Sequence, residues 1–208
     1  MKNFNQLSKT EKRVLIAKDA LQQLFLEHYK AKNGTYVSQK VTKQDRKKLN
    51  QLRADYRYHD YDEYKVTALE NGLTQGEPCQ VCAIGSCMAS AIRFGITPSE
   101  SYVTDNNANL HYEDFQWKLN KIFDDKTLRL MEAHFENEFV DEMEPFYSEW
   151  LGGYKADVRL YGILKNVIKN KGKFIPPAKF DSKLKDRFEK EKTDYLRKVK
   201  LRAAKDKR

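Results

Sequence analysis

The fifteen residues from Pro78 to Ile92 carry no charge, in a chain of 208 residues of which 33% are charged. This stretch is shorter than the ~20 apolar residues that cross a bilayer, so it indicates a buried element and no membrane span. Proline is tolerated in the first turn of a helix. The bulky apolar residues of the stretch lie at helical spacing: Val81, Ile84, Met88 and Ile92. The sequence therefore predicts a central core helix over 79–93.

Helical patterns also run through the rest of the chain. Ser8 and Glu11 match a capping box before an apolar stripe, so we expect a first helix of about twenty residues. A charged helix is expected over 43–53, and another from Asp60 to Asn71, closed by Gly72. An irregular connection is expected over 137–153, where an acidic, aromatic segment is interrupted by proline and glycine.

The predicted fold class is all-α, because no convincing alternating strand stands in the sequence outside a short segment at 35–37. We expect a compact multi-helix domain over 8–177, built around the buried central helix. A basic C-terminal helix is expected over 178–208. The first residues contain no apolar leader, so the chain is expected in the cytoplasm of a bacterial host cell, with association with a virion also open.

The charge of the chain is concentrated at its C-terminus. Residues 171–208 hold fifteen Lys and Arg against six Asp and Glu, and the rest of the chain is balanced. A dense basic helix attracts polyanions such as nucleic acid. The cations expected to bind are Lys183, Arg187, Lys190, Arg197, Lys198, Lys200, Arg202 and Lys205. Two alternatives remain open, namely a solvated helix with i,i+4 ion pairs and a module that docks an acidic partner protein.

A second basic segment, 43–64, mixes cations with aromatic residues. Arg53 and Arg57 stand among Tyr56, Tyr58, His59, Tyr61 and Tyr64. Aromatic rings that stack on bases, beside cations that meet phosphates, are typical of proteins that bind single-stranded nucleic acid. The alternative, which we favour, is that these tyrosines are half-buried and cover apolar surface with the hydroxyl outward.

Three cysteines, Cys79, Cys82 and Cys87, crowd the uncharged stretch. An odd number indicates no disulfide framework, and a zinc site would need a fourth ligand from elsewhere in the fold. A thiol enzyme would need a partner such as His111 or His134. Because free cysteine behaves as a small hydrophobe, packing is the expected role, and no cofactor is expected.

Five sequence blocks follow one another between residues 11 and 177. They are Arg13-Val-Leu-Ile-Ala-Lys-Asp-Ala-Leu, Gly34-Thr-Tyr-Val, Cys79-Gln-Val-Cys-Ala-Ile-Gly-Ser, Ile122-Phe-Asp with Leu130-Met-Glu-Ala-His-Phe-Glu, and Arg159-Leu-Tyr-Gly-Ile-Leu-Lys-Asn-Val-Ile-Lys-Asn-Lys-Gly-Lys-Phe. In this order they resemble an uncharacterised family of small bacterial and phage proteins with a Cys-x-x-Cys-Ala-x-Gly motif in the central helix. The resemblance implies a phage or bacterial intracellular protein with a compact helical domain, and it implies no activity. The pair Ser86-Cys87 and the tail after Pro177 depart from it.

Together these observations predict a non-enzymatic phage or bacterial accessory protein. It is expected to bind nucleic acid, or a nucleoprotein assembly, through its basic C-terminal helix. A cysteine-dependent enzyme or a metal-binding protein centred on the three cysteines is the alternative.

Overall fold

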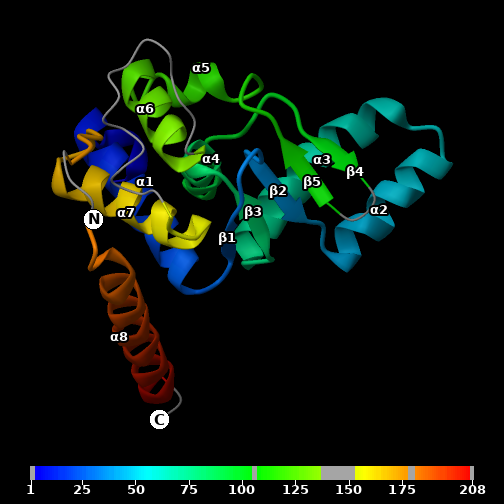
Figure 1. The fold of residues 1–208 in the computed structure, drawn as a ribbon. Coiled ribbons are helices and arrows are strands. Elements are labelled where there is room, and N and C mark those ends of the chain that lie inside the picture. The colour runs from blue at the N-terminus through cyan, green and yellow to red at the C-terminus, as the bar shows by residue number, and fades with distance from the viewer. Residues whose placement is uncertain (1–2, 105–106, 137–152, 178–180, 207–208) are drawn as a thin grey trace.

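A computed structural model describes residues 3–104, 107–136, 153–177 and 181–206, and within them the chain forms eight α-helices and a five-stranded sheet (Figure 1). The prediction of an all-α fold is therefore wrong, and the fold is mixed α/β. Most of the irregular connection expected over 137–153 lies outside the described residues. The elements are η1 (Phe4–Gln6), α1 (Lys9–Phe25), β1 (Tyr29–Ala31), β2 (Val37–Lys40), α2 (Lys43–Ala54), α3 (Tyr58–Gln75), β3 (Cys79–Val81), α4 (Ala83–Arg93), β4 (Tyr102–Thr104), β5 (Asn107–Leu110), α5 (Gln116–Leu119), α6 (Asp125–Glu136), α7 (Ala156–Lys169) and α8 (Leu184–Lys205).

The sheet joins distant segments in the order β1-β3-β2-β5-β4. Strand β1 pairs with β3 in parallel, and the other neighbours are antiparallel. Val37 of β2 faces Val81 of β3 on one side and Leu110 of β5 on the other. All three side chains are buried, so this row of side chains is the part of the sheet in the hydrophobic core, where the helices pack.

The predicted central helix over 79–93 is two elements. Cys79–Val81 form β3, in which the outer residues are buried and Gln80 is exposed, as expected for a strand with one covered face. The helix α4 begins only at Ala83, with Cys82 as its N-cap. Every residue from Ala83 to Ile92 is buried, so the expectation of a buried helix at the centre of the fold is confirmed for this part.

Gly85 allows α4 to lie directly against the chain that enters β2. A Cβ atom on Gly85 would stand only 1.4 Å from the carbonyl oxygen of Tyr36 and 2.3 Å from its carbonyl carbon. The same approach lets the Cys82 N–H donate to the Thr35 carbonyl at 2.6 Å. The glycine of the Cys-x-x-Cys-Ala-x-Gly pattern is thus required because the Tyr36 backbone lies directly against it.

Helices α1, α3 and α6 surround α4. The capping box of Ser8 and Glu11 is confirmed at the start of α1. The helix expected to end at Gly72 continues to Gln75, and Gly76 takes the left-handed position after it. Gly72 instead lies against β2, where a Cβ would stand 2.8 Å from the Gln39 side chain. Among the helices of the described ranges, none combines the length and the apolar content that a bilayer span requires.

Candidate functional site

The first half of α8 is packed on the body of the protein. Leu184 and Phe188 are buried, and the Phe188 ring lies against the rings of Tyr161 and Phe25, with centroids 5.3 Å and 6.1 Å away. Two ion pairs fix the helix from the side. Lys165 on α7 pairs with Glu191 at 2.9 Å, and Lys192 pairs with Glu27 at 2.7 Å. This pairing lowers the pKa of the Glu27 carboxyl.

The predicted cations of this first half are divided between the body and solvent. Arg187 pairs with Asp181, just before the helix, and this contact raises the pKa of its guanidinium. Lys183 is the exposed residue that precedes α8, and Lys190 is exposed. The alternative of i,i+4 ion pairs along the helix is not observed among the described residues. The pairs concerned are Asp186 with Lys190 and Asp194 with Lys198.

The second half of α8 extends away from the body, toward the lower left of Figure 1. Arg197 is exposed and pairs with Asp194 at 3.1 Å. Lys198, Lys200, Arg202 and Lys205 are exposed, and none of them forms an ion pair with a carboxylate of the described residues. Their spacing of four and three residues places Lys198, Arg202 and Lys205 on one face of the helix. This face is called the α8 basic end below, together with Arg197 on its flank and Lys200 on the opposite side of the same turns.

Arg53 and Arg57 lie elsewhere, where α2 meets α3. Figure 1 shows this helical hairpin at one extremity of the molecule and the end of α8 at another, so the two groups of predicted residues do not form one surface. Arg53 is exposed, whereas Arg57 pairs with Asp60. The expectation that the tyrosines are half-buried is confirmed for Tyr61 and Tyr64 and is wrong for Tyr56 and Tyr58, which are exposed at the tip of the hairpin.

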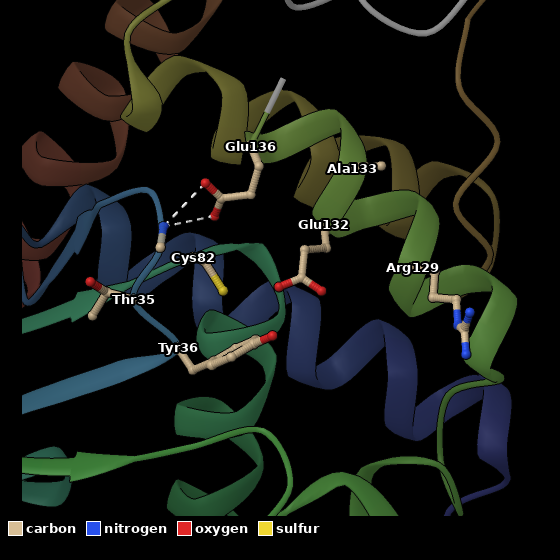
Figure 2. A pocket seen from close by; sticks show the side chains of 8 residues that line it. Thr35, Tyr36, Cys82, Arg129, Glu132, Ala133 and Glu136 are labelled. Atoms are coloured by element: carbon tan, nitrogen blue, oxygen red, sulfur yellow. Dashed lines mark hydrogen bonds between the residues drawn. The ribbon is translucent and has the colours of Figure 1, made fainter. Parts of the chain in front are cut away.

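A cavity of about 450 Å³ opens between α6, the start of α4 and the segment before β2, and sequence reasoning did not predict it. Figure 2 shows the Cys82 sulfur, the Glu132 carboxylate and the Tyr36 hydroxyl turned toward this space, with Arg129 directed away. Burial, followed by the charge of Glu132 and a hydrogen bond to it, raises the pKa of Tyr36. Opposite them, the Gly34 N–H donates to both oxygens of Glu136 at 3.1 Å.

This cavity does not activate a thiol. Burial raises the pKa of Cys82 to about 12, and the charges of Glu132 and Glu136 also act in that direction, against the hydrogen bonds from Gly85 and Ile84 at the helix start. Burial raises the pKa of Cys79 and, to about 12, that of Cys87. A nucleophile needs a lowered thiol pKa, so the chemistry is unfavourable at all three sulfurs.

The histidines proposed as partners of a reactive cysteine pack against other aromatic rings. The His111 ring lies edge-on to Tyr102 at 5.1 Å, and the His134 ring lies edge-on to Phe174 at 5.2 Å. Within the described residues, the cysteines belong to no group of three side chains whose ligand atoms are close enough to share a metal ion. All three cysteine side chains are free thiols buried in the core, which agrees with the expected role in packing.

Comparison of the chain with models of protein families, with curated proteins and with solved structures gives no match.

Proposed function

We propose that the protein binds nucleic acid through the α8 basic end. The observation that supports this proposal is the division of one helix into two halves. The first half is held by buried side chains and by ion pairs to the body. The second half presents four exposed cations that form no ion pair with a carboxylate of the described residues, namely Lys198, Lys200, Arg202 and Lys205. Cations without protein partners are free to replace the counterions of a polyanion.

The arrangement of these cations suits an extended polyanion better than a single small anion. Lys198 and Lys205 are seven residues apart, which corresponds to about 10 Å along a helix axis. Double-stranded DNA carries one negative charge per about 1.7 Å of its axis, so several phosphates come within reach of this length. A small anion would meet only one or two of the cations at a time.

Neutralising the face tests the proposal. The variant K198Q/R202Q/K205Q keeps the helix and removes three positive charges, so its fold and melting temperature should stay those of the wild type. Binding of a fluorescent 20-base-pair duplex should weaken, and the slope of log K against log salt should fall in magnitude by roughly 2–3. Anisotropy titrations at several salt concentrations measure both quantities.

The matched control is K9Q/K18Q/K126Q, which removes the same charge from exposed lysines outside α8 and α2. It should leave the slope almost unchanged. Equal losses in the two variants would show that only net charge matters, and no loss in the α8 variant would place binding elsewhere. Either result contradicts the proposal.

A further inference from the structure

The hairpin of α2 and α3 presents two exposed tyrosines at its tip. Tyr56 is 78% exposed and Tyr58 is 56% exposed, and their rings meet edge-on with centroids 6.2 Å apart. Neither ring covers the core, unlike Tyr61 and Tyr64, which are packed against it. A pair of large aromatic side chains held in solvent is available for stacking with a ligand.

The backbone at Tyr56 gives no local reason for a tyrosine. Its φ of 55° is left-handed, and its N–H donates to the Arg53 carbonyl at 3.2 Å while the Arg57 N–H donates to that of Leu52 at 2.9 Å. This is the hydrogen-bond pattern of a Schellman motif, whose left-handed position is usually glycine. A bulky residue is disfavoured there. Local stability therefore favours glycine at 56, and the tyrosine ring costs stability.

The outer face of α2 is basic because its only acid points inward. Asp45 is 2% exposed and accepts hydrogen bonds from the Tyr64 hydroxyl at 2.8 Å, from the Asn71 amide at 2.9 Å and from the Thr42 hydroxyl at 2.6 Å. An open groove of about 490 Å³ follows the opposite face. Its lining residues are Lys43, Arg46, Lys47, Asn50, Gln51 and Ala54. Cations and amides thus line a path along the helix toward the tyrosines.

The carboxylates that flank the two tyrosines in the sequence, Asp55 and Asp60, both contact other side chains. The Gln51 amide donates to both oxygens of Asp55, at 3.0 Å and 2.9 Å. Asp60 pairs with Arg57. Arg53, one helical turn before Tyr56, forms no ion pair with any carboxylate in the described part of the chain. The tip therefore combines two exposed rings with a free cation.

We propose that the α2–α3 hairpin binds single-stranded nucleic acid, with Tyr56 and Tyr58 stacked on unpaired bases and the outer face of α2 on the phosphates. Stacking on aromatic rings needs base faces, which a duplex covers within its own stack. The hairpin would therefore distinguish single strands from duplex, which the α8 basic end has no means to do. This inference rests on the proposed function, because it takes nucleic acid as the ligand. It adds a second binding surface, the α2–α3 hairpin, and a preference of that surface for single strands over duplex.

The variant Tyr56→Gly tests the proposal without risk to the fold. Glycine relieves the left-handed backbone, so the melting temperature of the protein should rise by about 2–4 °C. Binding of a labelled 20-nucleotide oligothymidine should weaken about tenfold, which is the order of loss seen when one stacking ring is removed. Binding of the 20-base-pair duplex should remain within about twofold of the wild type, because no base face is exposed there. Tyr58→Ala should behave in the same direction on the single strand.

The control is Trp117→Ala, which removes another exposed ring that lies near two lysines, Lys118 and Lys121, outside the hairpin. It should leave oligothymidine binding unchanged. The proposal is overturned if Tyr56→Gly binds oligothymidine like the wild type, or if it loses duplex and single strand equally. If the α8 variant keeps full duplex binding while Tyr56→Gly loses the single strand, the role of α8 fails and the hairpin assignment stands.

Discussion

Gly85→Ala is expected to destabilise the fold more than any other exchange of glycine for alanine that we consider. The added Cβ would lie 1.4 Å from the Tyr36 oxygen, whereas ordinary contact begins near 3.4 Å, so the two segments would have to separate by about 2 Å. Both are held on their far sides. Helix α4 is buried along its length, and Tyr36 immediately precedes Val37, which is paired with both neighbouring strands of β2.

The expected loss follows from what this separation breaks. Forcing an extra methyl group into a packed core costs about 1–3 kcal/mol, and a clash with backbone lies at the upper end. Moving Tyr36 also stretches the hydrogen bond from the Cys82 N–H to the Thr35 carbonyl, and buried groups left unpaired cost about 1–3 kcal/mol. The free energy of unfolding should therefore fall by about 4–6 kcal/mol, against a usual total of about 5–15 kcal/mol.

Thermal unfolding followed by circular dichroism measures this loss. For a chain of this size the melting temperature should fall by about 10 °C or more. Gly95→Ala is the control, because Gly95 has a φ of 86° and open space around the added Cβ, so only backbone strain of about 1–2 kcal/mol is expected. If Gly85→Ala melts no lower than Gly95→Ala, the close approach of Tyr36 does not carry the stability assigned to it.

Three further predictions concern buried polar and titratable groups. Burial, followed by the charge of Arg93, lowers the pKa of His28 from 6.5, so the folded state binds this proton less well than the unfolded chain. The free energy of unfolding in urea should thus stay constant above about pH 6.5 and fall below it, and His28→Gln should reduce that fall. Because burial raises the pKa of the thiols, Ellman's reagent should modify none of them until the protein unfolds, and fast modification of Cys82 in the native protein would revive the cysteine-enzyme alternative. Asp45→Ala should lower stability by about 3 kcal/mol in chemical denaturation, since the Tyr64 hydroxyl and the Asn71 amide lose a charged acceptor, whereas Asp62→Ala on the surface should change it by less than about 0.5 kcal/mol.

The helices could be predicted from the sequence because their signals are local. The capping box before α1 and the charged helix expected over 43–53, which is α2, are found where the patterns indicate. The sheet could not be predicted, because its strands are three or four residues long and are stabilised by pairing with distant segments. In β2 the pattern is also hidden, because Gln39 is buried and donates to the backbone carbonyl of Glu77 at 3.0 Å, so a polar residue occupies a core position.

The cations of the candidate site could be predicted in part, because charge density is a local signal whereas pairing with distant residues is not. Charge density identified the cations of α8, but only the folded chain separates those that pair with the body from those that do not, since Glu27 and Lys192 are 165 positions apart. The exposure of Tyr56 has a weak local signal. It lies beyond Leu52, the last buried residue of α2, in a largely polar junction.

The division of α8 also bears on the affinity for nucleic acid that we propose for its basic end. The basic end spans nine residues, 197–205. A free segment of this length is too short to form a stable helix in water, because the first turn is costly to nucleate. In this protein the residues from Leu184 to Glu191 are already helical and are anchored by Leu184 and Phe188, so the following turns only need to propagate. Lys198, Arg202 and Lys205 therefore remain aligned on one face before any ligand arrives, and binding does not have to order them first. A disordered tail with the same charges would lose part of its affinity to this ordering, and the alignment of α8 removes that loss.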